Sequence, residues 1–270
     1  MLCFYFNYMY PFRVIFSILF FQISVFSETL WQKCVTSDNL WQKCVTSDNK
    51  YTCLIDKIKG IMQKEKYLVG IAGNIGVGKT TVTQKLSEQL GWTPYFESVI
   101  DNPYLDDFYK DMTRWSFNLQ IYFLAHRFRS QKEIAESTIS AIQDRTIYED
   151  VEIFAASLHE QGFMNKRDYA CYRDLFNNMV PYLPKPDVII YLRASVDTLV
   201  RRIASRGRDF EQTIQREYLE YLNGAYERWM ERAKKEFCVL EIDANDVDYV
   251  NDNGDLQKLI INIREYCPGK

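Results

Sequence analysis

A glycine-rich segment that ends in a lysine and a threonine is the part of this sequence best suited to chemistry. Residues 73–80 read GNIGVGKT and fit the pattern G-x-x-x-x-G-K-S/T. Glycines let the backbone curl so that successive N–H groups point inward, the lysine adds a positive charge, and the threonine hydroxyl is a ligand for Mg²⁺. Such a loop binds a polyphosphate. The residues expected to contact it are Gly73, Asn74, Ile75, Gly76, Val77, Gly78, Lys79, Thr80 and Thr81.

A strand before this loop and a helix after it are needed to hold it in place. Residues 67–72 form a short apolar run, and residues 79–90 carry apolar side chains at helical spacing. Further apolar runs and helical stretches alternate along the chain, which is typical of a parallel sheet covered by helices on both faces. We therefore expect an α/β fold built as one domain. The other expected strands are 94–96, 146–148, 187–192 and 237–242, and the expected long helices are 112–142, 150–180 and 214–236.

The composition limits the classes of function. The chain has 270 residues, with 33 Lys+Arg against 36 Asp+Glu, and so has a net charge of −3. Without an overall basic excess, the chain is not expected to bind a nucleic-acid polymer, and anion binding must be local. His126 and His159 have no Cys or His companions at the spacing of metal ligands, so both are expected to be ordinary helix residues.

The first fifth of the chain differs from the rest. Residues 1–27 hold Arg13 as their only charged side chain, and residues 30–39 (LWQKCVTSDN) are repeated identically at 40–49. We expect residues 1–61 to be an atypical extension outside the functional unit, or the result of a start codon assigned too early. Under the alternative, the apolar stretch is a real signal or membrane anchor. The working chain is then 62–270, and we expect it to be cytoplasmic and without membrane contact.

Several motifs agree in their order with one family. They are GNIGVGKTT at 73–81, FES with NPYLDDFY at 96–109, LQIYFLAHRF at 119–128, DRTIYEDVEIFA at 144–155 and RRIASRGRDFE at 201–211. In these motifs the chain resembles the deoxyribonucleoside kinases, in particular the bacterial deoxyadenosine/deoxyguanosine kinases. The resemblance implies that ATP donates its γ-phosphate, with Mg²⁺, to the 5′-hydroxyl of a deoxyribonucleoside. It also implies a homodimer.

Glu97 follows the expected strand at 94–96 and should therefore lie at the carboxyl edge of the sheet, where ligands of open α/β folds bind. A carboxylate there can accept a proton, although a glutamate after a strand is more often a solvated surface residue. With a loose transition state it need only orient a hydroxyl and take the proton late. The resemblance assigns Glu97 this role toward the 5′-hydroxyl.

Two pairs of residues, each pair within one expected helix, form the expected base site. Gln120 and Arg127 are seven positions apart and therefore lie on one helix face, and Asp150 and Phe154, four apart, share another. By resemblance, Gln120 hydrogen-bonds the base, Phe154 stacks on it, and Arg127 pairs with Asp150 at its far edge. A carboxylate there favours a base with an amino group, which indicates deoxyadenosine, deoxyguanosine or deoxycytidine over thymidine.

The remaining expected site residues serve the sugar, the metal ion and the phosphates. By resemblance, Tyr109 and Glu211 hold the 3′-hydroxyl, Asp144 helps Thr80 to hold Mg²⁺, and Arg145 reaches the phosphate or Glu97. Three arginines surround Gly207 and are expected to form a mobile lid that neutralises the transferring phosphate. In this lid Arg206 and Arg208 act on the reacting phosphate, and Arg202 contacts the nucleotide.

Two other functions share the phosphate-binding loop. One is a different small-molecule kinase, such as a nucleoside monophosphate kinase, which needs a basic pocket for the phosphate of its acceptor. The other is a non-catalytic nucleotide-binding module anchored to a membrane by residues 1–27.

Overall fold

The computed structural model describes residues 66–97, 102–208, 211, 213–247 and 253–267. The expected extension 1–61 lies outside these residues, so its separation from the functional unit stays a prediction. Within the described residues, no helix combines the length and the apolar character that crossing a bilayer requires.

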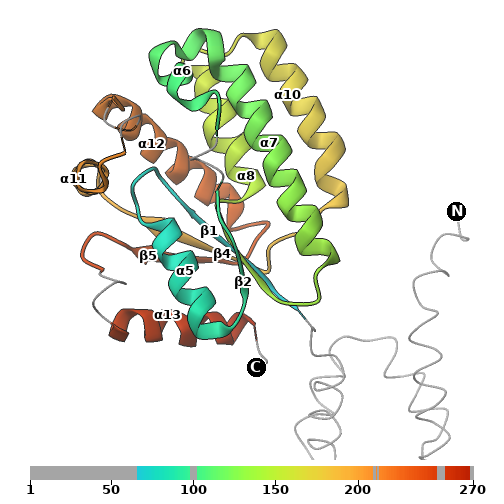
Figure 1. The fold of residues 1–270 in the computed structure, drawn as a ribbon, viewed down its shortest axis with the longest axis vertical. Helices are drawn as coiled ribbons and strands as arrows, with labels where there is room; N and C mark the ends of the chain where they lie inside the picture. Colours follow the sequence, from blue (N-terminus) through green and yellow to red (C-terminus); the bar gives the residue numbers. More distant parts are fainter. Residues whose placement is uncertain (1–65, 98–101, 209–210, 212, 248–252, 268–270) are drawn as a thin grey trace, which may run out of the picture. The chain divides into compact units, whose positions relative to one another are not determined.

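A five-stranded parallel sheet forms the centre of the fold (Figure 1). Its strand order is β2-β3-β1-β4-β5, and every neighbouring pair is parallel. All strand carboxyl ends therefore meet at one edge. The order reverses beside β1, the position at which open α/β sheets bind ligands. The strands are β1 (Leu68–Gly73), β2 (Thr93–Tyr95), β3 (Ala141–Asp144), β4 (Val188–Arg193) and β5 (Val239–Asp243).

Helices cover both faces of this sheet, which confirms the expected α/β class (Figure 1). They are α5 (Lys79–Leu90), α6 (Leu105–Lys110), α7 (Met112–Glu136), α8 (Ile147–Glu149), the π-helix η1 (Asp150–Ala155), α9 (Ala156–Glu160), α10 (Lys166–Met179), the 3-10 helix η2 (Val180–Tyr182), α11 (Val196–Arg206), α12 (Arg216–Ala233) and α13 (Asn253–Tyr266).

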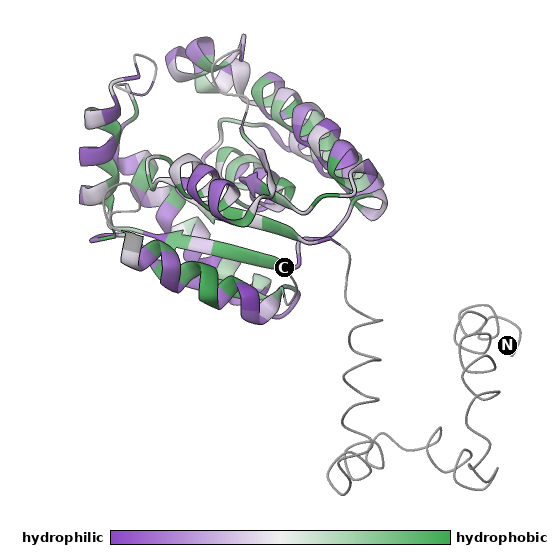
Figure 2. Ribbon diagram, turned by 60° about the horizontal axis from the view of Figure 1, so that its bottom comes forward, coloured by the Kyte–Doolittle hydropathy of each residue, from purple (hydrophilic) through white to green (hydrophobic). Residues whose placement is uncertain are grey.

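Strand β4 shows why the central strands read as continuous apolar runs. Its alternate residues Val188, Ile190 and Leu192 belong to one core cluster, whereas Ile189 and Tyr191 belong to another on the opposite face. Successive strand side chains point to opposite faces, so a strand buried on both faces must be apolar throughout. Figure 2 shows hydrophobic strands and helices that carry both hydrophobic and hydrophilic residues.

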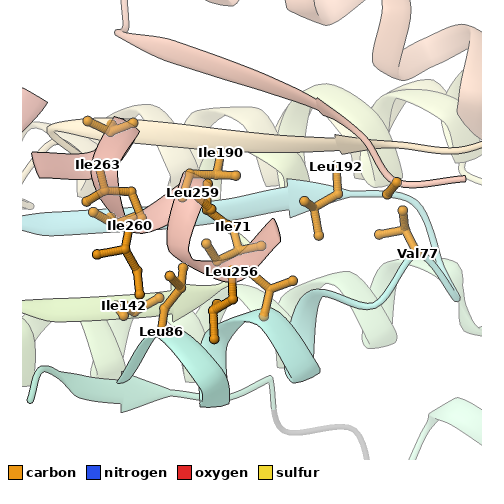
Figure 3. Packing of buried hydrophobic residues seen from close by; sticks show 14 of the residues in the cluster. Ile71, Val77, Leu86, Ile142, Ile190, Leu192, Leu256, Leu259, Ile260 and Ile263 are labelled. Atoms are coloured by element: carbon orange, nitrogen blue, oxygen red, sulfur yellow. The ribbon is translucent and has the colours of Figure 1, made fainter. Parts of the chain in front are cut away.

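The core on one face holds the helix that follows the phosphate-binding loop. Leu86 of α5 is fully buried and belongs to the same core cluster as Ile71 of β1, Ile142 of β3 and Ile190 of β4 (Figure 3). Side chains of α13 complete this layer. Packing α5 against the sheet fixes the direction of its first turn, which lies at the carboxyl end of β1.

One expected strand is wrong. Residues 146–148 do not form a strand; the strand is β3, which begins at Ala141 and ends at Asp144. Thr146 instead begins α8, because its hydroxyl accepts from the Glu149 N–H while the Glu149 carboxylate accepts from the Thr146 N–H. This reciprocal capping satisfies backbone donors that a strand would have used otherwise. The expected helix 112–142 accordingly ends at Glu136.

The expected helix 150–180 is interrupted. It consists of η1, α9 and α10, with a turn at Gly162, whose φ is 80°. Such a backbone conformation is readily adopted by glycine and ends the first helical part. Asn165 then begins α10, because its side chain accepts from the Asp168 N–H.

Candidate active site

A cavity of about 1100 Å³ lies at the carboxyl ends of the strands. Residues that follow β1, β2, β3 and β5 line it, as the topology requires. The structure brings most of the expected site residues to this one cavity. They are Ile75, Gly76, Val77, Gly78, Lys79, Thr80, Thr81, Glu97, Tyr109, Gln120, Asp144, Arg145, Asp150, Phe154, Arg202, Arg206, Arg208 and Glu211. Gly73, Asn74 and Arg127 do not line it.

The phosphate-binding loop joins β1 to α5 and places the N-terminus of α5 at the cavity. Gly73 begins it with a φ of 146°, and a Cβ there would lie 2.6 Å from the Leu192 carbonyl oxygen. Lys79 Nζ donates to the carbonyl oxygens of Gly73 at 2.9 Å and Asn74 at 3.0 Å. Burial and the nearby Arg145 charge lower the pKa of Lys79 to about 8. An anion in the loop would favour the charged form of this lysine.

Thr80 and Asp144 place three oxygen atoms beside the loop. The Thr80 hydroxyl donates to Asp144 Oδ2 at 2.6 Å, and Asp144 Oδ1 is buried without a hydrogen-bond partner among the described residues. Burial raises the pKa of Asp144, although Lys79 opposes the rise. Hard oxygen donors of this kind suit Mg²⁺, which often binds through one or two protein groups together with substrate phosphates. Nowhere in the described part of the chain do three His, Cys, Asp or Glu side chains gather as a metal site.

Glu97 follows β2 and is held by two arginines through one oxygen. Its Oε1 lies 2.7 Å from Arg145 Nε and 3.0 Å from Arg127 Nη2. Burial by itself would raise the pKa of Glu97, but Arg145, Arg127 and Lys79 outweigh it and lower the pKa to about 2. The group is therefore a carboxylate at neutral pH. Among the described residues, no hydrogen bond is found to its other oxygen, Oε2.

Arg127 connects the two carboxylates of the site. It donates to both oxygens of Asp150 and through Nη1 to the Asp144 carbonyl oxygen at 3.0 Å. The expected pairing with Asp150 is present in the structure, but Arg127 is not among the residues that line the cavity. Gln120, on the same face of α7, is 2% exposed and lines the cavity. Its Oε1 is buried and has no partner in the described part of the chain.

Arg145 has an unusual backbone. Its φ is 69°, and it is the only non-glycine residue with a positive φ that the structure describes. This conformation costs about 1–3 kcal/mol and persists where surrounding contacts enforce it. The guanidinium lies over the Phe154 ring, 4.2 Å from its centroid. One face of the Phe154 ring is thus covered by Arg145.

Arg202, Arg206 and Arg208, the three arginines of the expected lid, make different contacts in this structure. Arg206 and Arg208 both pair with Glu211, Arg208 Nη1 at 3.3 Å from Oε1. Arg202 lies within α11 and donates to the carbonyl oxygens of Val77 at 2.8 Å and Ala244 at 2.7 Å. Arg202 therefore braces the phosphate-binding loop, whereas Arg206, at the end of the same helix, pairs with Glu211. The action of the three arginines as a lid stays a prediction.

Sequence reasoning missed two buried residues next to the site. Glu149 and Tyr226 are both 0% exposed and contact Gly73, the first residue of the loop. The Thr146-x-x-Glu149 spacing is a capping-box signal that could have indicated Glu149. No local signal indicates Tyr226, which comes from α12, far along the chain.

Comparison with known proteins decides the family. The family model "Deoxynucleoside kinase" matches residues 69–268. The chain belongs to the deoxynucleoside kinase family. This kinase is 43% identical over 199 residues to a deoxyadenosine/deoxycytidine kinase of Bacillus subtilis, covering 73% of this chain and 91% of that protein. It is 41% identical to a deoxyadenosine kinase of Dictyostelium discoideum, covering 70% of this chain and 78% of that one.

Solved structures agree with this assignment. The kinase matches a deoxyadenosine kinase from M. mycoides, solved with dCMP and dCDP, at a TM-score of 0.66 and 34% identity. The match covers 73% of this chain and 98% of that one. The same M. mycoides enzyme has also been solved with bound dATP, at a TM-score of 0.65. The resemblance stated from the motifs is thereby confirmed for fold, family and enzyme class.

Proposed function

We propose that this deoxynucleoside kinase uses ATP and Mg²⁺ to phosphorylate the 5′-hydroxyl of deoxyadenosine or deoxyguanosine, with deoxycytidine as a further substrate. The observation that carries the proposal is the single cavity, which a phosphate-binding loop lines together with Glu97, Gln120 and Asp150. The relatives support the choice of bases, since they are named as kinases of deoxyadenosine, deoxycytidine and deoxyguanosine.

The phosphates of ATP bind the loop from Gly73 to Thr81. Backbone N–H groups at the start of α5 and the Lys79 ammonium supply positive charge to them. Thr80 and Asp144 would hold Mg²⁺, whose charge helps to neutralise the transferring phosphate. Arg206 and Arg208 exchange Glu211 for the reacting phosphate as it approaches. Catalysis then consists of positioning and charge neutralisation.

Glu97 orients the acceptor. With a pKa of about 2 it is a weak base for a free alcohol. As a carboxylate it accepts a hydrogen bond from the 5′-hydroxyl through Oε2 and takes the proton late, when the oxygen–phosphorus bond is largely formed. Arg145 and Arg127 keep Oε1 in place during this step. Tyr109 and Glu211 border the same cavity and hold the 3′-hydroxyl of the sugar.

The base lies between Gln120 and Phe154. The Gln120 amide donates and accepts in the plane of the base, and Asp150, fixed by Arg127, accepts from an exocyclic amino group. Thymine presents a carbonyl and a methyl group there, so its recognition leaves Asp150 facing another acceptor. Amino-bearing bases are therefore preferred.

A phosphorylation assay with ATP and each of the four deoxynucleosides tests this function. We expect the full chain to use deoxyadenosine or deoxyguanosine best and thymidine worst. Thymidine as the best substrate would contradict the proposed base site. Turnover of a deoxynucleoside monophosphate without turnover of the nucleoside would contradict the proposed acceptor.

The proposal includes the working chain 62–270, a homodimer and a cytoplasmic location. Removal of residues 1–61 should leave kcat within about twofold, because every residue that we assign to the site lies within 62–270. Light scattering should give twice the chain mass, and fractionation of cells should recover the enzyme with the cytosol. Recovery in the membrane fraction would favour residues 1–27 as an anchor.

A further inference from the structure

A buried network joins Arg145 to the first residue of the phosphate-binding loop. Arg145 Nη1 donates to the Tyr226 hydroxyl at 3.1 Å, and this hydroxyl lies 2.8 Å from Glu149 Oε1 and 2.9 Å from the Gly73 carbonyl oxygen. The Gly73 N–H donates to Glu149 Oε1 at 3.1 Å. Tyr226 and Glu149 do not line the cavity, so any effect on the reaction passes through the residues that they touch.

Every member of the network has a hydrogen-bond partner, whichever acceptor takes the Tyr226 proton. Glu149 Oε1 also accepts from the Gly73 N–H, and the Gly73 carbonyl oxygen also accepts from Lys79 Nζ. The Tyr226 hydroxyl accepts from Arg145 and has one proton to donate, either to Glu149 or to Gly73. The second oxygen of Glu149 accepts from the N–H and the hydroxyl of Thr146, at 2.7 and 3.1 Å. Buried networks whose members are all satisfied are rigid and costly to break.

The backbone of Arg145 needs such support. It has a φ of 69°, which a side chain rarely adopts and which persists where the surroundings hold it. Its N–H donates to the Ile71 carbonyl oxygen at 3.0 Å, which places it beside β1. Its guanidinium is held by Tyr226 on one nitrogen and lies 2.7 Å from Glu97 through another.

We propose that Tyr226 and Glu149 are positioning residues for phosphoryl transfer. They hold the Arg145 guanidinium at a fixed position relative to the phosphate-binding loop, and Arg145 in turn keeps Glu97 in place. The inference rests on the proposed roles of Arg145 and Glu97. Under this proposal α12, which carries Tyr226, contributes to catalysis although Tyr226 does not contact the substrate.

Tyr226→Phe is the direct test, because it removes the hydroxyl and keeps the ring. We expect kcat for deoxyadenosine to fall about tenfold or more, while the KM for deoxyadenosine changes less than about twofold. Tyr191→Phe is the matched control: the Tyr191 ring stacks on Tyr226, but its hydroxyl donates to Glu227 outside the network. An unchanged kcat in Tyr226→Phe, or an equal fall in Tyr191→Phe, would overturn the proposal.

A second measurement separates positioning from a general loss of structure. If Tyr226 acts through Arg145, then Tyr226→Phe should lower kcat less than about twofold in an Arg145→Lys background. The same fold-change in both backgrounds would overturn the proposal. If Tyr226→Phe does not fold, Glu149→Gln is measured in the same two backgrounds and read by the same criteria. Failure of the proposed function can be distinguished from failure of this inference, because in the first case the unsubstituted chain itself would lack the predicted turnover.

Discussion

Arg127 holds Asp150 by two hydrogen bonds, from Nε to Oδ2 at 2.9 Å and from Nη2 to Oδ1 at 3.2 Å. Both side chains are buried, at 5% and 3% exposure. Because removal of one partner leaves a buried charge unpaired, a single substitution at either position should destabilise the fold by about 3–5 kcal/mol.

Base choice is therefore best tested by removing both charges together. The double substitution Arg127→Gln with Asp150→Asn keeps polar groups in the pair and removes the carboxylate that we propose accepts from the base. We expect the ratio of kcat/KM for deoxyadenosine to that for thymidine to fall about tenfold or more. A ratio that stays the same would show that the pair does not select the base. Arg114→Gln, an exposed change on the same helix, is the control.

Glu97→Gln tests the acceptor side of the reaction. The amide keeps the shape but cannot take a proton, so we expect kcat to fall by more than about 100-fold while binding of deoxyadenosine survives. Steady-state kinetics and calorimetric binding give the two quantities. Glu88→Gln, an exposed glutamate of α5, should leave both unchanged. An unchanged kcat in Glu97→Gln would show that the carboxylate is not required for the reaction.

The pKa of Glu97 also predicts a pH dependence of stability. Its folded value of about 2 lies below the ordinary value of 4.5, so the folded state binds this proton less readily than the unfolded state. The stabilisation is present above about pH 4.5 and is lost as the pH falls toward 2; it amounts to at most about 3 kcal/mol. Urea unfolding of the unsubstituted chain and of Glu97→Gln, followed from pH 6 to 3, should give a shallower fall for the variant. Parallel curves would contradict the assignment.

Thr80→Val tests the oxygen site for Mg²⁺. Valine keeps the branched shape and removes the hydroxyl that contacts Asp144. We expect a higher Mg²⁺ concentration for half-maximal rate and a fall in kcat of about tenfold or more, and a chelator should abolish turnover of the unsubstituted chain. Thr83→Val is the control, because the buried Thr83 hydroxyl has no hydrogen-bond partner among the described residues. A Mg²⁺ dependence unchanged by Thr80→Val would exclude the hydroxyl as a ligand.

Sequence patterns predicted the boundaries of helices and strands correctly where the signal is local. The expected helix 79–90 matches α5 residue for residue, and the apolar runs at 187–192 and 67–72 lie within one residue of β4 and β1. Residues 141–148 were misread because two elements meet there within a few residues. A polar strand end and a capping box give opposing local signals, and only pairing with β1 and β2 identifies the strand.

By itself, the sequence determined the class of fold, the phosphate-binding loop and the family, because each depends on residues that are neighbours in the chain or recur at fixed spacing. Only the tertiary structure decided that Arg127 is buried between two carboxylates, that Arg202 braces the loop, and that Tyr226 contacts Arg145. Hydrogen bonds and charge interactions act over a few ångströms in space, and these contacts join residues separated by tens of positions in the chain.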